Sequence, residues 1–258
     1  MKRFEDHVAV VTGAASGIGK QLASDLAARG STVVGVDVQD FEQSQNPTIT
    51  PIQCDLADVD AYVDLLAKVE AEHGRIDILA NVAGIDRPVS ATSRDLALYR
   101  TILQVNFFAP LAGTLTVVPG MVARGRGYIV NVSSDSIRSP IAGASAYIAS
   151  KGALTGFSES AALELKRQGV HIHILYPGFV YSAMGRESIE HGMKPPPRVI
   201  VKSPKQVSSL TLARLGGRRI DINTSRITTI TPFIKMVAPS LYRRMMDSRS
   251  LPTPEVDT

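Results

Sequence analysis

Tyr147 and Lys151 are the residues of this chain best suited to proton transfer. They are four positions apart and precede the run G-A-L-T-G-F-S-E-S-A-A-L-E-L-K, which is typical of a helix, and residues at that spacing lie one turn apart on one face. An ammonium about 4 Å from a phenol contributes about 4 kcal/mol at an effective dielectric of about 20. The spacing therefore predicts that Lys151 lowers the Tyr147 pKa and makes the tyrosine a general acid/base. The same spacing also occurs by chance on solvated helix faces.

A hydroxyl that could bind a reacting oxygen lies upstream of this pair. Ser134 follows the apolar run 128–133, which is typical of a buried strand. A side chain at the end of a strand is well placed to hydrogen-bond a substrate oxygen. In isolation Ser134 could equally be a turn residue.

The elements that must position these residues are apolar runs of strand length alternating with longer helical patterns. Val and Ile dominate the runs, as in strands covered on both faces. The alternation predicts a single-domain α/β fold, a doubly wound parallel sheet with helices on both faces. The expected strands are 7–12, 32–36, 49–54, 76–80, 127–132 and 170–176, and the expected helices are 17–28, 59–72, 96–123 and 146–167.

A glycine-rich turn, T-G-A-A-S-G-I-G, follows the first expected strand and opens the first expected helix. Its glycines permit a tight turn, close approach of the backbone to a phosphate and close helix packing. The helix N-terminus adds unpaired N–H groups and the positive end of the helix dipole. This context predicts a dinucleotide site. The turn residues expected to contact the cofactor are Gly13, Ser16, Gly17, Ile18 and Gly19.

Asp37 ends the second expected strand, 18 residues beyond Gly19. A carboxylate at this place can accept hydrogen bonds from the adenosine ribose and would repel a 2′-phosphate. Neither Ser16 nor Val38 supplies a compensating positive charge. We therefore expect NAD, with NADP less favoured. The alternative is that Asp37 only shapes a turn.

Composition and charge exclude several function classes. The 258 residues are 44% hydrophobic and 20% charged, an ordinary globular composition. We expect no signal peptide, no membrane-spanning segment and no metal site, and the single cysteine, Cys54, suits a cytoplasmic protein. Residues 186–258 hold 13 Lys or Arg against 6 Asp or Glu. Because no nucleic-acid motif accompanies this charge, we expect a solvated surface and no nucleic-acid partner.

Four features together resemble the short-chain dehydrogenase/reductase family: the glycine turn, N-V-A-G at 81–84, Ser134, and Y-x-x-x-K with Ser134 thirteen residues before Tyr147. The likeness covers about residues 6–184 and implies a Rossmann-like fold. It implies that Tyr147 is the general acid/base and that Lys151 binds the nicotinamide ribose. It also implies that Ser134 binds the substrate oxygen and that Asn106 holds a water in a proton relay.

The resemblance implies further cofactor contacts and a quaternary structure. The additional contacts are Asp55, Leu56, Asn81, Ala83, Gly84, Pro177, Gly178, Val180 and Ser182. A homodimer or homotetramer is expected. Two departures stand out: Val82 replaces the family's usual second asparagine, and the tail lacks the common strand with an Asp-Gly-Gly-like turn. The tail is more similar to the branch that acts on lipophilic alcohols.

These features favour an NAD-dependent oxidoreductase that interconverts a secondary alcohol and a ketone, with a lipophilic small molecule as the expected substrate. A second hypothesis is a catalytically inactive protein that senses dinucleotides on the same fold. The complete set of Asn106, Ser134, Tyr147 and Lys151 argues for the enzyme. A dehalogenase or dehydratase would need no phosphate-binding turn.

The sequence beyond the core, 185–258, predicts a substrate lid and an amphipathic tail. Residues 185–205 are expected to be loop-like, since Pro195, Pro196 and Pro197 exclude a helix there. In the tail an apolar stripe at helical spacing should be broken by Pro232 and Pro239 at first-turn positions. The stripe could cover the sheet edge, form a subunit interface, roof the pocket, or make peripheral contact with an anionic membrane. It comprises Ile227, Ile230, Ile234, Val237, Leu241 and Met245.

Overall fold

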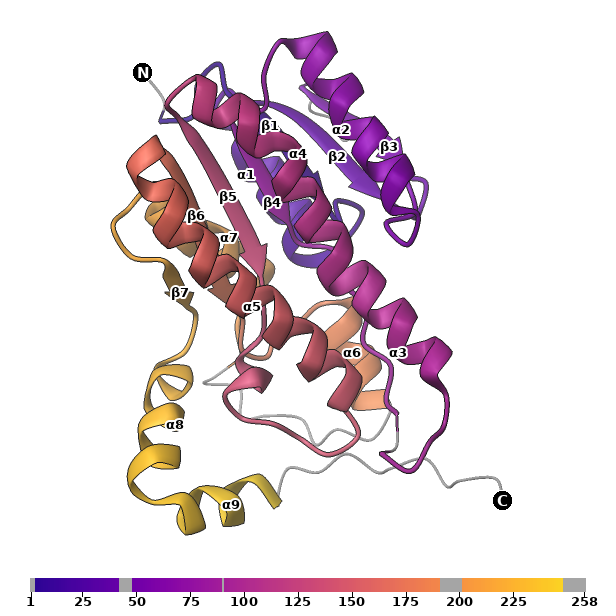
Figure 1. The fold of residues 1–258 in the computed structure, drawn as a ribbon, viewed down its shortest axis with the longest axis vertical. Helices are drawn as coiled ribbons and strands as arrows, with labels where there is room; N and C mark the ends of the chain where they lie inside the picture. The colour runs from indigo at the N-terminus through magenta and orange to yellow at the C-terminus, as the bar shows by residue number, and fades with distance from the viewer. Residues whose placement is uncertain (1–2, 42–47, 90, 191–200, 248–258) are drawn as a thin grey trace.

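A parallel sheet of seven strands organises the chain (Figure 1). The computed structural model describes residues 3–41, 48–89, 91–190 and 201–247. The strand order is β3-β2-β1-β4-β5-β6-β7, and every neighbouring pair is parallel. The strands are β1 (Val8–Thr12), β2 (Thr32–Asp37), β3 (Ile49–Gln53), β4 (Ile78–Asn81), β5 (Gly127–Val132), β6 (Val170–Tyr176) and β7 (Asp221–Asn223). The doubly wound α/β fold predicted from the sequence is confirmed.

Helices cover both faces of the sheet and give it two apolar cores. One core packs α2, α4 and α5 against the sheet, and the other packs α1 and α7 against the opposite face. The helices are α1 (Gly17–Ala27), α2 (Val59–His73), α3 (Leu96–Leu103), α4 (Ala109–Ala123), α5 (Ser145–Leu165), α6 (Ala183–Glu190), α7 (Pro204–Arg214), α8 (Arg226–Val237) and α9 (Pro239–Asp247). The expected strands and helices are all present, with ends shifted by at most two residues.

The strand order places a ligand-binding crevice. From β1 the chain runs to β2 and β3 on one side, and then crosses to β4 on the other side of β1. In open α/β sheets, ligands bind outside the carboxyl ends of the strands at this reversal. The glycine turn after β1 and the N-V-A-G segment at the end of β4 both lie there.

The long helix expected at 96–123 contains a π-helical turn, η1 (Gln104–Phe108), between α3 and α4. Such turns are frequent at functional sites, and this one carries Asn106. By length and composition alone, Leu96–Ala123 could also cross a membrane, which the sequence expectation missed. Core helices of soluble proteins meet the same two criteria.

The second half of the chain differs from expectation in three places. Residues 185–190 belong to α6 and are not a loop, whereas Pro195 to Pro197 lie outside the described residues. Helix α7 was missed, although its start has a clear signal. Ser203 and Gln206 form a capping box, with Pro204 at the first position. A short strand, β7, does extend the sheet.

The tail folds as two helices, and only one of its prolines acts as predicted. Pro239 opens α9, but Pro232 lies inside α8. Three members of the stripe, Ile230, Val237 and Leu241, are exposed and so do not cover the sheet edge. Among the tail side chains that the structure describes, the buried ones are Thr231, Tyr242 and Met246, and these contact the domain.

Candidate active site

The glycine turn is held against the end of β4 by backbone contacts. The Thr12 hydroxyl oxygen accepts hydrogen bonds from the backbone N–H groups of Val82 (3.0 Å) and Ala83 (3.1 Å). Gly13 has φ +70°, and a Cβ there would lie 3.0 Å from Ala83 backbone atoms. A Cβ on Gly19 would overlap the Gly13 carbonyl. The turn therefore requires glycine at both positions, as in turns whose backbone closely approaches a pyrophosphate.

The Asp37 carboxylate stabilises the backbone of this turn and also places a negative charge beside it. One carboxylate oxygen accepts the Ala15 N–H at 3.0 Å, and the other accepts the Gln39 N–H at 3.0 Å. The side chain is half-buried at the end of β2. Asp37 therefore shapes the turn, as the alternative hypothesis predicted. Its negative charge also lies at the rim of the crevice.

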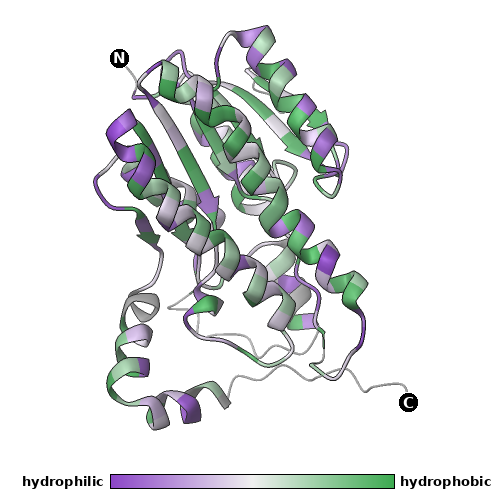
Figure 2. Cartoon of the chain, viewed as in Figure 1, coloured by the Kyte–Doolittle hydropathy of each residue, from purple (hydrophilic) through white to green (hydrophobic). Residues whose placement is uncertain are grey.

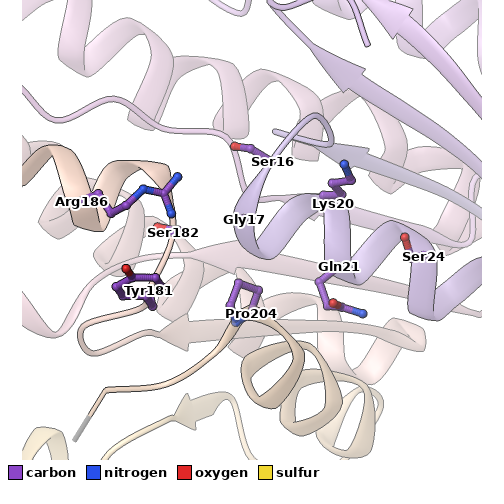
Figure 3. A pocket seen from close by; sticks show the side chains of 9 residues that line it. All are labelled: Ser16, Gly17, Lys20, Gln21, Ser24, Tyr181, Ser182, Arg186 and Pro204. Carbon is purple, nitrogen blue, oxygen red and sulfur yellow. The ribbon is translucent and has the colours of Figure 1, made fainter. Parts of the chain in front are cut away.

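A cavity of about 320 Å³ opens at the N-terminus of α1 (Figure 3). Ser16 is the N-cap of α1, but its side chain makes no capping hydrogen bond. Two cations that the sequence reading missed, Lys20 and Arg186, line the cavity. A cavity at a helix N-terminus with cations on its wall suits a phosphate group. Its walls are Ser16, Gly17, Lys20, Gln21, Ser24, Tyr181, Ser182, Arg186 and Pro204.

Ser134 and Tyr147 lie together at the carboxyl end of β5. Ser134 caps the short helix η2 (Asp135–Ile137), where its oxygen accepts the Ser136 N–H at 3.2 Å and the Ser136 hydroxyl at 2.8 Å. Tyr147 lies in the first turn of α5 and hydrogen-bonds Ser134. The fold therefore brings two hydroxyls, thirteen residues apart in the sequence, into contact beside the crevice.

Lys151 is buried beneath this pair. Its ammonium donates to the Val132 carbonyl at 2.9 Å and lies 5.8 Å from the centroid of the Tyr147 ring. The side chain is only 3% exposed. Burial lowers the pKa of Lys151 to about 8, and the nearby Asp86 carboxylate partly opposes that shift.

The expectation that Lys151 lowers the Tyr147 pKa is wrong for this structure. Burial of the phenol raises the Tyr147 pKa, and the Ser134 hydrogen bond only partly offsets this. The Asp86 and Asp135 carboxylates raise the pKa further. Desolvation is the largest of these effects, and the Lys151 ammonium donates to the Val132 carbonyl. Tyr147 is accordingly a neutral phenol near neutral pH and can donate a proton.

Asn106 is fully buried, and its amide joins two segments of the site. Its oxygen accepts the Ile85 N–H at 2.8 Å, and its nitrogen donates to the Ile85 carbonyl at 2.9 Å and the Ser150 hydroxyl at 3.0 Å. Ser150 in turn donates to the Tyr147 carbonyl at 2.7 Å. Asn106 therefore ties the segment after β4 to α5. Its role in holding a water stays a prediction.

Asn81, predicted to contact the cofactor, directs its side chain into the core. Its nitrogen donates to the Asn131 oxygen at 2.7 Å, and its oxygen accepts a long 3.4 Å hydrogen bond from the Tyr62 hydroxyl. Asn131 donates onward to the Ser158 hydroxyl at 2.8 Å. This network joins β4, β5, α2 and α5, so only the Asn81 backbone remains for a cofactor.

The other predicted cofactor residues surround the same crevice. Asp55 is exposed just beyond β3 and accepts the Ala57 N–H at 2.9 Å, while Leu56 is buried. A side chain at Gly84 would be tightly packed, because a Cβ would lie 3.1 Å from the Asn106 oxygen and 3.2 Å from the Lys151 nitrogen. Pro177, Gly178, Val180 and Ser182 continue from the end of β6 toward α6.

Arg138 links the Ser134 loop to the end of the chain, which the sequence did not indicate. Its guanidinium donates to Asn223 (2.7 Å) and Asp221 (2.9 Å) on β7 and lies 3.8 Å over the Tyr176 ring. Its carbonyl accepts the Tyr242 hydroxyl of α9 at 3.0 Å. Arg138 therefore holds η2, and with it Ser134, against the sheet.

We expect Arg138→Gln to lower kcat by about tenfold while leaving the dinucleotide Kd unchanged, because small displacements of a substrate-binding group slow catalysis. Steady-state kinetics and fluorescence titration with dinucleotide would measure the two quantities. Arg126→Gln is the matched control, since Arg126 lies at the opposite end of β5. Equal losses in both variants would contradict a positioning role.

The fold and the site first define a class of protein. A dinucleotide-type glycine turn lies at the switch point of a doubly wound sheet, and a Ser–Tyr–Lys group lies beside it, as in an NAD(P)-dependent oxidoreductase. Residues 7–192 match the family model described as short chain dehydrogenase. The chain belongs to the short-chain dehydrogenase/reductase family.

Relatives agree with this assignment. The chain is 31% identical over 263 residues to the rat (Rattus norvegicus) protein "Dehydrogenase/reductase SDR family member 7B", covering 94% of this chain and 81% of that protein. It is 36% identical over 196 residues to "Short-chain reductase protein NovJ" of Streptomyces niveus, covering 72% of this chain and 74% of that one.

Solved structures have the same fold. A short chain dehydrogenase from Burkholderia cenocepacia, in complex with NADP, superposes with a TM-score of 0.80 at 24% identity, covering 94% of this chain and 98% of that one. The aldohexose dehydrogenase of Thermoplasma acidophilum has a TM-score of 0.76 at 26% identity, covering 86% of this chain and 94% of that one.

Proposed function

We propose that this protein is an NAD-dependent oxidoreductase that interconverts a secondary alcohol and a ketone. The contact between the Tyr147 and Ser134 hydroxyls, with Lys151 buried beneath, carries the proposal. Two hydroxyls on one side of a crevice can both hydrogen-bond a single carbonyl or carbinol oxygen. The resulting polarisation stabilises charge on that oxygen in the transition state.

The residues present fit a dinucleotide. The Lys151 ammonium has three donors, and its hydrogen bond to the Val132 carbonyl uses one of them, so donors remain for ribose hydroxyls. A Cβ at Gly84 would crowd the Lys151 ammonium at 3.2 Å, so glycine keeps the approach to that ammonium open. A bound nicotinamide would supply hydride transfer to or from the carbinol carbon. Tyr147 would donate or accept the proton, while Ser134 orients the substrate oxygen.

The charges of the site favour a neutral, lipophilic substrate. Asp86 and Asp135 both act on the Tyr147 hydroxyl electrostatically, and they would repel a carboxylate or phosphate on the substrate. The exposed apolar tail helices extend from the same end of the sheet. This is tested by measuring turnover, through NADH absorbance, on secondary alcohols and ketones of increasing size that are neutral, anionic or cationic. Preference for a small anionic substrate would overturn it.

We propose NAD as the preferred cofactor because of Asp37, and we expect Asp37→Asn to reduce that preference. The variant keeps an oxygen for the Ala15 N–H but removes the charge that opposes a 2′-phosphate. Hydrogen bonds to a charged group contribute about 1.5–3 kcal/mol, so the NAD/NADP ratio of kcat/KM should fall about tenfold to a hundredfold. An unmodified protein that used both cofactors equally would refute this role of Asp37. Asp60→Asn, at an exposed aspartate in the first turn of α2, is the control.

We also propose self-association through the outer faces of α4 and α5, where Leu115 and Leu163 are exposed beside Phe108 at the end of η1. A shallow apolar hollow of about 250 Å³ lies beside two of them. Covering these side chains would remove apolar area from water.

A further inference from the structure

Helices α8 and α9 expose large apolar side chains that no described segment covers. Thr231, Tyr242 and Met246 make the buried contacts of this tail, at 3%, 6% and 9% exposure. The opposite side is open. Its exposed residues are Ile230 (53%), Phe233 (59%), Met236 (73%), Val237 (56%) and Leu241 (55%).

The exposed residues of α8 form one face. Ile230, Phe233 and Val237 are separated by three and four positions, and Met236 follows Phe233 by three, so they lie within about one third of the helix circumference. Thr231 lies on the opposite side and is buried. Exposed single apolar residues are ordinary, whereas a contiguous face of this kind marks an interaction surface.

The positive charge beside this face favours an anionic partner. Helices α8 and α9 together have four basic residues and one acidic residue, Asp247, at the last position of α9. Lys235, Arg243 and Arg244 are exposed, and Figure 2 shows apolar and hydrophilic residues intermixed along both helices. A second copy meeting this face symmetrically would bring like charges together. An anionic lipid surface offers both complementary charge and an apolar layer.

We propose that α8 and α9 form a bilayer-docking surface that inserts Phe233, Met236 and their apolar neighbours into anionic membranes. The surface lies beyond the carboxyl ends of the strands, at the same end as the candidate active site (Figure 1). It is joined to the Ser134 loop by the hydrogen bond from the Tyr242 hydroxyl to the Arg138 carbonyl. Docking would therefore bring the substrate crevice to the bilayer, where neutral lipophilic molecules concentrate.

Cosedimentation of the full chain with vesicles tests docking independently of catalysis. Vesicles of phosphatidylcholine with about one third phosphatidylserine should bind the protein at about 0.05 M NaCl and release most of it at about 0.5 M NaCl. Vesicles of phosphatidylcholine alone should bind it at least about tenfold more weakly. Failure to bind the anionic vesicles at low salt would overturn the proposal, even if the proposed enzyme activity were intact.

Two double variants locate the surface. Arg243→Gln with Arg244→Gln removes two charges, each contributing about 1 kcal/mol near an anionic membrane, and should weaken binding about tenfold to thirtyfold. Phe233→Ser with Met236→Ser should weaken it at least about tenfold. Leu96→Ser is the control, because Leu96 is an equally exposed apolar residue on α3 (64%). Circular dichroism melting would confirm that all variants are folded.

The outcomes separate the occupants of this surface. Loss of binding in both double variants but not in Leu96→Ser supports docking through α8 and α9. Binding that all variants retain would overturn the proposal. So would a concentration-dependent dimer that the Phe233/Met236 variant abolishes, without vesicle binding, since the face would then be an interface between copies.

Discussion

Replacing Tyr147 with phenylalanine is expected to lower kcat by about a hundredfold to ten-thousandfold, the range that a positioned general acid/base contributes. The phenyl ring keeps the volume, so the dinucleotide Kd should change by less than about threefold. The hydroxyl that contacts Ser134 is lost, and with it the proton donor. Stopped-flow turnover and fluorescence titration with NADH would measure the two effects.

Tyr99→Phe is the matched control for this experiment. The Tyr99 hydroxyl lies 2.7 Å from the Ser145 hydroxyl at the start of the same helix, so the variant removes a phenol hydrogen bond nearby without touching the Ser134 contact. Its kcat should stay near that of the unmodified protein. A Tyr147→Phe protein with near-normal turnover would refute the mechanism and favour the dinucleotide-sensing hypothesis.

Replacing Lys151 with methionine should abolish turnover and weaken dinucleotide binding, yet stabilise the fold near pH 7. The buried ammonium has a pKa of about 8, below its usual 10.5, so folding is penalised wherever the lysine is protonated in both states, that is, below about pH 8. The penalty fades as the pH rises from about 8 toward 10.5. An apolar side chain of similar length removes it, although the Val132 carbonyl loses its donor.

Denaturant unfolding of Lys151→Met and the unmodified protein at two pH values measures this effect. The variant should be about 1–3 kcal/mol more stable at pH 7, as when buried charges are replaced by apolar groups. The difference should shrink near pH 10, because the unmodified protein then folds with a neutral lysine. Lys68→Met, on the exposed side of α2, is the control. A less stable variant at pH 7 would show that the ammonium stabilises the fold.

Local patterns were sufficient to predict the core of this protein. The strands and the helices that pack on the sheet have regular patterns of apolar residues. Strands β1 to β6 and the helices through α5 were therefore predicted with ends within two residues. The glycine turn was equally clear, because only glycine permits the close approach of Gly13 and Gly19 to their neighbours. Helix α7 was not predicted, although the capping box of Ser203 and Gln206 marks its N-terminus.

The direction of side chains and the balance of charge were decided only by the tertiary structure. Asn81 could be placed on β4 from its motif, but its burial in a network with Asn131 depends on strands fifty residues apart. The i, i+4 spacing brought Lys151 near Tyr147, yet desolvation by surrounding elements reversed the expected pKa shift. The orientation of the tail was also decided by the tertiary structure. Periodicity predicted an apolar face on α8, but it could not show whether that face is buried. In the structure Thr231 and Tyr242 are buried against the domain, and the apolar face is exposed.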